Sequence, residues 1–138
     1  KPQIDFHRAS SVPVYSMNTI FSGKPNLVND LDLEGIVFSD MPWLVRTSGR
    51  FDRTTLPFTL NTPYRYSVTD RLFALGMDAY VLNRLATCMH ADPQQTYAGA
   101  SGLLSVGWDG RVHRISDWVR FTDGLPKAWE PSLGTGKG

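Results

Sequence analysis

The sequence lacks most of the features from which the function of a protein can be predicted directly. It holds one cysteine, Cys88, which cannot form a disulfide within the chain. Its 14 Lys and Arg against 13 Asp and Glu give a formal charge of +1, and these charges are scattered rather than massed, so no cationic surface for nucleic acid is expected. No apolar run reaches the length of a membrane-spanning helix, and the start, KPQIDFHRAS, lacks the apolar core of a secretion signal. Its 138 residues therefore indicate one modest globular unit that does not bind nucleic acid.

Patterns of catalytic and metal-binding residues are missing as well. The three histidines, His7, His90 and His113, do not have the spacing of metal ligands, and Cys88 is no partner for them. No G-x-S-x-G turn is present, and no glycine-rich phosphate loop precedes a helix. The terminal GTGKG lacks the spacing and the following helix of such a loop, so it is interpreted as a linker. The sequence predicts neither a metal nor a cofactor.

Four acidic side chains and the cysteine could in principle have either a functional or a structural role. The acidic residues near the first strands are Asp30, Asp32, Glu34 and Asp40. Paired carboxylates can act as general acid and base. Acidic residues around loops and strand entries are mostly solvated, however, and we expect that here. We expect Cys88 to be a small buried residue of a helix. Nothing in the sequence supports an enzyme.

Two short apolar segments predict neighbouring strands near the N-terminal end. The first is VPVYSM, Val12 to Met17, and the second is Ile36 to Ser39, with a polar loop and a short helix in LVNDLDLEG between them. Strands that are apolar throughout and separated by a helix or loop are typical of a parallel sheet covered on both faces. Pro42 has no amide hydrogen, so the second strand should end near Asp40 or Met41.

The strongest predicted element is a long helix, SVTDRLFALGMDAYVLNRLATCM. Apolar residues recur in it at spacings of three and four, which places them on one face. This stripe comprises Leu72, Leu75, Ala79, Leu82, Leu85, Ala86 and Met89, and a second stripe beside it comprises Phe73, Met77 and Tyr80. We expect these stripes to be buried against a sheet and another helix, with Gly76 allowing close approach.

A β-hairpin is predicted in GLLSVGWDGRVHRISDWVRF. Asp109 and Gly110 tolerate the positive φ angles of a tight turn. Leu103 to Val106 should therefore pair with Val112 to Ile115, and Trp118 to Phe121 should continue as an extended segment.

Five residues are candidates for a binding site because they lie at or just beyond the ends of the predicted strands. They are Tyr15, Ser16, Asp40, Met41 and Trp43. Open α/β sheets bind ligands at the carboxyl ends of their strands, so these residues should line a ligand cleft or contact a partner. For Trp43 two interpretations stay open, since it either packs a hinge or lines the cleft. Most other aromatic residues are expected to be core or hinge packing.

Four segments together resemble a known family. VPVYSMNTIFSG, NDLDLEGIVFSDMPWLV, RLFALGMDAY and GASGLLSVGWDGRVHRISDWVRF look like the C-terminal portion of the LppC/LpoA family. Its members are outer-membrane lipoproteins that activate a class A penicillin-binding protein. The segments DLEGIVFSDMPWLV and RLFALGMDAY are the more specific, since the hairpin is shared more loosely with amino-acid-binding periplasmic proteins.

The resemblance implies a fold. It predicts an α/β fold that is part of a type I periplasmic-binding-protein-like domain. In such a domain, crossing strands join two doubly wound lobes. This chain would be a C-terminal fragment of the domain with a terminal β-hairpin. Residues 1–44 would end the second lobe. Residues 45–100 would be the return segment of the first lobe with its long helix. Residues 101–138 would hold the hairpin, a crossing strand and a flexible tail, and the remaining strands of the sheets are expected upstream of Lys1.

The resemblance also implies a function. The chain would belong to a noncatalytic periplasmic regulator that binds and activates a class A penicillin-binding protein. Its parent would be anchored to the inner face of the outer membrane through a lipidated N-terminus absent here. The alternative is a periplasmic protein that binds an amino acid or a peptidoglycan fragment in its interlobe cleft. Tyr15, Ser16, Thr19 and Asp40 would then supply the polar contacts.

Overall fold

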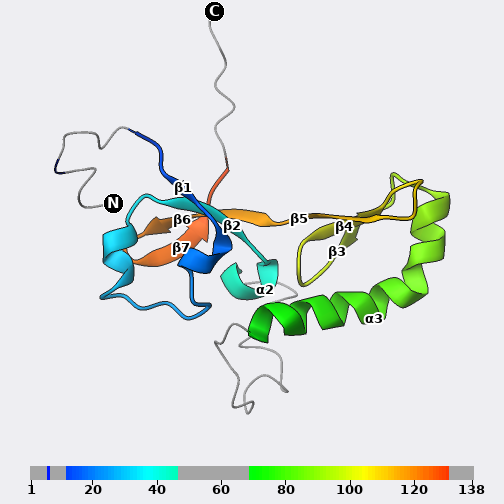
Figure 1. Ribbon diagram of the computed structural model, residues 1–138, viewed down its shortest axis with the longest axis horizontal. Coiled ribbons are helices and arrows are strands. Elements are labelled where there is room, and N and C mark those ends of the chain that lie inside the picture. The colour runs from blue at the N-terminus through cyan, green and yellow to red at the C-terminus, as the bar shows by residue number, and fades with distance from the viewer. Residues whose placement is uncertain (1–5, 7–11, 47–68, 131–138) are drawn as a thin grey trace, which may run out of the picture.

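The fold consists of two β-sheets side by side and one long helix (Figure 1). It comes from a computed structural model that describes residues 6, 12–46 and 69–130. The first sheet has the order β1 (Tyr15–Ser16), β2 (Val37–Asp40), β6 (Asp117–Thr122), β7 (Leu125–Ala128). The second has the order β3 (Tyr97–Ala98), β4 (Leu103–Val106), β5 (Val112–Ile115). The helical elements are η1 (Asn18–Ile20), η2 (Asp30–Leu33), α2 (Pro42–Val45) and α3 (Thr69–Ala91).

The first sheet confirms the predicted parallel pair but is itself mixed. β1 and β2 run parallel, whereas β6 pairs antiparallel with β2, and β7 pairs antiparallel with β6. β2 ends at Asp40, as the proline two residues later requires. The predicted strand Val12 to Met17 shortens to the two residues of β1, and η2 is the short helix predicted before β2.

The core of the first sheet is aromatic. Phe21, Phe38 and Phe121 are buried, and their ring centroids lie 5.0 to 6.2 Å apart. Offset and edge-on contacts at such distances are the favoured arrangements of aromatic rings. Leu44 and Val45 of α2 belong to the same cluster. This core holds the carboxyl end of β2 in a fixed position.

The second sheet contains the predicted hairpin. β4 and β5 pair antiparallel from Leu103 with Ile115 to Val106 with Val112. Gly110 has a φ of +77°, the conformation expected of it in the turn. The hairpin prediction is confirmed.

Another hairpin was not predicted. β6 and β7 are joined by Asp123 and Gly124, whose φ angles are 56° and 70°. This is the same Asp-Gly signal as at residues 109 and 110. Only a crossing strand and a flexible tail were expected here, and β7 contains a proline, Pro126. β7 is an edge strand of its sheet, where proline is tolerated.

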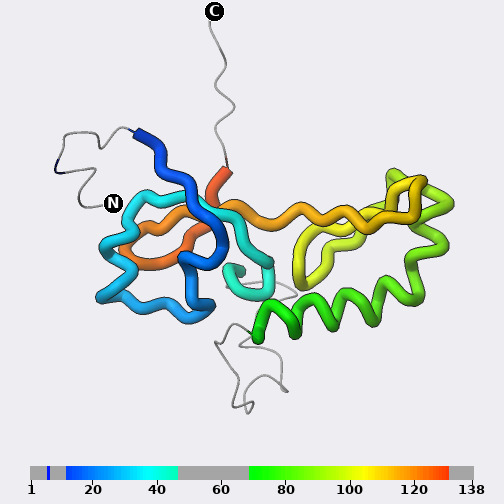
Figure 2. Tube along the Cα trace, in the orientation of Figure 1, coloured from blue at the N-terminus to red at the C-terminus, as the bar shows by residue number. Residues whose placement is uncertain are grey.

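The two sheets share one extended stretch of chain. β5 ends at Ile115 and β6 begins at Asp117, so Ser116 alone separates them. Figure 2 shows this stretch crossing from the second sheet to the first, while α3 runs below the second sheet. The extended segment predicted from Trp118 to Phe121 is therefore present within β6.

The long helix is present, but the prediction of its buried face is wrong. Within the described residues of α3 only Ala74, Asp78 and Met89 are buried, whereas Leu72 is 67% exposed. Gly76 makes no close approach, since nothing lies within 4 Å of the place a Cβ would take. Apolar residues surround so much of this helix that periodicity cannot select one face. Its contacts with α2 and with β4 decide the orientation.

Two expectations about burial are also wrong. Cys88 is exposed rather than buried, since it lies outside the small set of α3 residues that are buried. Asp40 is buried rather than solvated, because Arg71 pairs with it. Two of the features discussed from the sequence, His7 and the GTGKG linker, lie outside the described residues. In the part of the chain that the structure describes, no helix is long and apolar enough to cross a membrane.

Candidate functional site

The five predicted site residues fall into two groups. Tyr15 lies on the outward face of the first sheet and is 58% exposed, and Ser16 beside it is half-buried. Asp40, Met41 and Trp43 are buried where the first sheet meets α3. The structure thus does not bring all five together around one cavity. Their part in binding stays a prediction.

Tyr15 belongs to an aromatic cluster with Trp118 and Trp129. The three ring centroids are 6.2 to 6.3 Å from one another, each pair in an edge-on arrangement. The guanidinium carbon of Arg120 lies 5.6 Å from the Trp129 ring, within the range of a cation–π contact. The strand register explains this gathering, because Val37 of β2 pairs with both Tyr15 and Arg120. The result is a partly exposed aromatic surface on the sheet.

Trp43 packs between α2 and α3. It follows Pro42, which starts α2 with a preset φ. Its side chain is 1% exposed and its ring lies 5.6 Å from that of Phe73 in α3. Its backbone N–H donates a 3.0 Å hydrogen bond to the carbonyl of Ala100. These contacts tie the end of β2 to both the helix and the loop before β4.

Asp40 and Arg71 form a buried ion pair. Nη2 of Arg71 lies 2.6 Å from Oδ2 of Asp40, and Nε donates to Oδ1 at 3.1 Å. Nη2 also donates to the backbone carbonyls of Asn18 and Phe21, each at 2.9 Å. The side chain of Asp40 is 0% exposed and that of Arg71 is 15% exposed. A buried carboxylate needs donors that compensate for its lost hydration, and here a guanidinium of α3 supplies them, so the pair positions α3 on the first sheet.

Asp78 is a structural carboxylate that the sequence analysis missed. Its Oδ1 accepts the N–H of Ala100 at 2.7 Å, and Oδ2 accepts the N–H and the hydroxyl of Ser101 at 2.7 and 2.6 Å. A Cβ at Gly99 would lie 2.5 Å from this carboxylate, so any larger residue there would have to displace the Asp78 side chain. The signal was an acidic residue between apolar stripes of a helix, followed later by a run of small residues.

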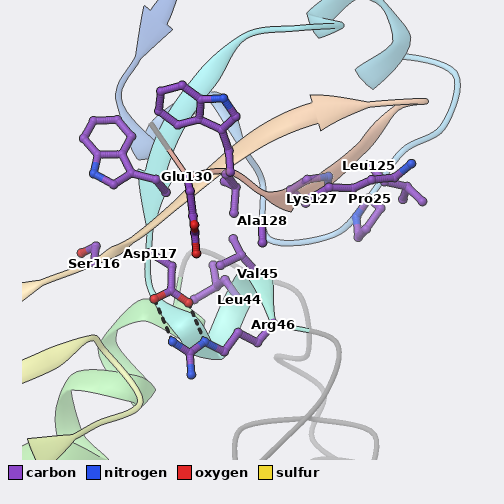
Figure 3. A pocket seen from close by; sticks show the side chains of 14 residues that line it. Pro25, Leu44, Val45, Arg46, Ser116, Asp117, Leu125, Lys127, Ala128 and Glu130 are labelled. Atoms are coloured by element: carbon purple, nitrogen blue, oxygen red, sulfur yellow. Dashed lines mark hydrogen bonds and ion pairs between the residues drawn. The ribbon is translucent and has the colours of Figure 1, made fainter. Parts of the chain in front are cut away.

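A groove of about 730 Å³ opens between α2 and the β6–β7 hairpin (Figure 3). Its walls are mostly apolar, and an arginine–aspartate pair lies at one end. The lining residues are Pro25, Leu44, Val45, Arg46, Ser116, Asp117, Trp118, Val119, Leu125, Pro126, Lys127, Ala128, Trp129 and Glu130. None of the five predicted site residues is among them. In the described residues no cluster of His, Cys, Asp or Glu could hold a metal ion.

The ion pair in the groove is bidentate. Nε of Arg46 donates to Oδ2 of Asp117 at 2.6 Å and Nη2 donates to Oδ1 at 2.9 Å, as Figure 3 shows. The hydrogen bond to Asp117 holds the pKa of Arg46 above its ordinary value. A raised arginine pKa stabilises the folded protein fully at every pH below the pKa that this arginine has in the unfolded chain. The contribution of Arg46 to the free energy of unfolding therefore does not change over the ordinary pH range.

Replacing this arginine should have a small effect. We expect Arg46→Ala to lower the free energy of unfolding by less than about 1 kcal/mol, because half of the Arg46 side chain is exposed to solvent that screens the pair. Urea unfolding followed by circular dichroism would measure this in low and high salt. A large loss that persists in high salt would contradict the screened pair.

Sequence comparisons place this chain among known proteins. The family model described as "LppC putative lipoprotein" matches residues 1–124. A similar curated protein is "Penicillin-binding protein activator LpoA" of Dickeya chrysanthemi, 33% identical over 128 residues that make up 90% of this chain. The match covers 18% of that relative, so the chain spans about a fifth of the length of the curated relatives it matches.

Structural comparisons agree with the sequence. The C-domain of LpoA from Haemophilus influenzae, described as "a regulator of PBP1A", aligns over 83% of this chain and 36% of that domain, with a TM-score of 0.62 and 22% identity. A putative branched-chain amino acid ABC transporter from Chromobacterium violaceum aligns over 80% of this chain and 34% of its own, with a TM-score of 0.58 and 25% identity. The α/β fold related to periplasmic binding proteins, with this chain as one fragment of it, is thus confirmed. From the family model, which spans nearly the whole length, it follows that the chain belongs to the LppC family of putative lipoproteins.

Proposed function

We propose that this chain is part of a noncatalytic periplasmic regulator that binds and activates a class A penicillin-binding protein. The observation that carries the proposal is the similarity, over 90% of the chain, to a relative named as a penicillin-binding protein activator. The activity of a whole regulator belongs to the proposal, because the match covers 18% of that relative. We further propose that the parent is anchored at the inner face of the outer membrane through a lipidated N-terminus.

A noncatalytic protein that activates an enzyme must meet one thermodynamic requirement. A regulator raises the activity of an enzyme by binding its active conformation more tightly than its inactive one. A preformed surface suits this task, because little conformational entropy is lost on binding. The two sheets and the aromatic core described above would supply such a rigid scaffold.

The division into lobes also remains a proposal. Residues 1–44 would belong to the second lobe, residues 45–100 to the return segment of the first, and residues 101–138 to the hairpin and crossing strand. This division is supported by the placement of β1 and β2 in one sheet and of the β4–β5 hairpin in the other. β6 and β7 would add two antiparallel strands to the second lobe.

The test uses the full-length protein that contains this chain and a purified class A penicillin-binding protein. We expect the regulator to bind the synthase and to raise its rate of glycan polymerisation or peptide cross-linking. A monofunctional transpeptidase serves as the control for class A specificity and should not respond. Binding without any change in rate, or no binding at all, would contradict the proposal.

One variant tests whether a predicted site residue contacts the synthase. Tyr15 is the most exposed of the five predicted residues and belongs to the aromatic cluster. Exposed Tyr and Trp often dominate binding energy, so Tyr15→Ala should weaken synthase binding by about tenfold or more if Tyr15 is a contact. Tyr80→Ala is the matched control, since Tyr80 is exposed on α3, away from that cluster. Equal affinities of both variants would remove Tyr15 from the contact surface.

A second candidate function is the binding of a small molecule. It is supported by the likeness to the putative amino acid transporter component. A ligand that binds only the folded state raises the melting temperature. Thermal unfolding of the full-length protein with amino acids and peptidoglycan fragments therefore separates a receptor, whose melting temperature rises, from a regulator that has no such ligand.

A further inference from the structure

The carboxyl ends of β1 and β2 are occupied by a side chain that comes from outside their sheet. Sheets of this kind bind ligands at the carboxyl ends of adjacent parallel strands. β1 and β2 are such neighbours. The chain leaving β1 presents the carbonyls of Asn18 and Phe21, and β2 ends on the carboxylate of Asp40. One atom, Nη2 of Arg71, lies 2.9, 2.9 and 2.6 Å from these three groups.

The chemistry of this position selects a cation. Two carbonyl oxygens and a carboxylate are all acceptors, and Oδ1 of Asp40 already accepts the N–H of Met41 at 2.8 Å. The carboxylate is fully buried and of its neighbours here only Met41 is a neutral donor, so a charged donor compensates best for its lost hydration. A planar guanidinium is well suited because it donates in several directions from one rigid group. The ends of β1 and β2 therefore form a guanidinium site.

Arg71 also joins two parts of the molecule. We define the first half as residues 12–46 and 117–130, which carry the first sheet, and the second half as residues 69–115, which carry α3 and the second sheet. The pair Arg71–Asp40 crosses between the halves. The other ion pairs in the described residues stay within one half, since Arg46–Asp117 and Lys127–Asp123 lie in the first and Arg111–Asp109 in the second.

We propose that Arg71 is a built-in ligand. Its guanidinium fills the position at which this fold would hold a small molecule. The ion pair with Asp40 thereby holds the second half against the first, and we call this pair the latch. Within the described residues the other links include the crossing chain at Ser116 and the hydrogen bond from Trp43 to Ala100. They also include apolar contacts, since Ala74 and Ala100 belong to the same buried cluster as the core of the first half. The sequence also passes between the halves from residue 46 to residue 69. A chain crossing can act as a hinge through changes at a few backbone positions. Without the latch, the angle between the halves becomes variable.

The test measures the distance between the halves in the full-length protein. Spin labels are placed on Cys88, which is exposed in the second half, and on Val28→Cys, an exposed position in the first half. The parent should give one narrow distance distribution. Arg71→Ala should broaden or shift it, and methylguanidinium should make it narrow again by filling the vacated site. The same compound should raise the melting temperature of Arg71→Ala, and ethylammonium, which lacks the planar group, should do so less.

Arg46→Ala is the matched control. It removes another bidentate arginine–aspartate pair, but one that lies inside the first half. It should leave the distance distribution as in the parent and should not respond to methylguanidinium. These measurements need no synthase, so a negative result in them is distinguishable from a failure of the proposed function.

A second variant covers the case in which Arg71→Ala does not fold. Asp40→Asn keeps the shape of the side chain and removes its charge, and it should broaden the distribution in the same way. The proposal is overturned if the folded variant retains the distribution of the parent. It is also overturned if methylguanidinium fails to act on a folded Arg71→Ala, or acts equally on the parent and on Arg46→Ala.

Discussion

Trp43→Ala should lower the free energy of unfolding by about 3–5 kcal/mol, the usual cost of truncating a buried large aromatic side chain. The indole is 1% exposed and packs on Phe73 of α3. Its removal leaves a cavity between α2 and α3 that the neighbouring elements fill only in part. Urea unfolding followed by circular dichroism would measure the loss.

Trp108→Ala is the control for this prediction. Trp108 lies in the turn of the β4–β5 hairpin and is 85% exposed, so its replacement should change the free energy of unfolding by about 0.5 kcal/mol or less. Equal small effects of both variants would contradict the packing of Trp43. Preserved stability of Trp43→Ala together with altered binding would instead favour the cleft interpretation of this residue.

Asp78→Asn should cost about 3 kcal/mol, although it replaces a single atom. The carboxylate accepts three hydrogen bonds from Ala100 and Ser101, and it is buried. An amide turns at least one of those acceptors into a donor that faces another donor. Hydrogen bonds to a charged acceptor contribute about 1.5–3 kcal/mol each, and an unsatisfied buried donor costs about 1–3 kcal/mol.

Hydrogen exchange would locate the effect of this change. The amides of Ala100 and Ser101 should lose protection first, because they are the donors to Asp78. Asp123→Asn is the control, since Asp123 is exposed and pairs with Lys127 at the surface, and we expect less than about 1 kcal/mol from it. Unchanged protection at residues 100 and 101 would show that Asp78 does not hold this loop.

The local elements followed from the sequence where one residue type forces the backbone. Pro42 ended β2, and Asp109-Gly110 made the predicted turn. The same reasoning at Asp123-Gly124 predicts a second hairpin, which was not recognised, and β7 contains Pro126, a residue that is unfavourable in most strands. Whether a strand lies at a sheet edge, where proline is tolerated, depends on its neighbours in space.

The candidate site was predictable only in part. The sequence placed Asp40 and Trp43 at the end of a strand, and the structure agrees. It gave no reason to connect Asp40 with Arg71, which is 31 positions away, or Asp78 with a loop 22 positions away. Asp40 was expected to be solvated, as carboxylates ordinarily are, and Asp78 was not singled out at all.

The sequence by itself determined the family, the parallel strand pair, the long helix and the hairpin. These depend on local composition and on steric limits that act within a few residues. Only the tertiary structure decided which face of α3 is buried, that Cys88 is exposed, and that Asp40 and Asp78 are buried. A charged group can leave water only where distant donors converge on it, and that convergence arises when the sheets and the helix assemble.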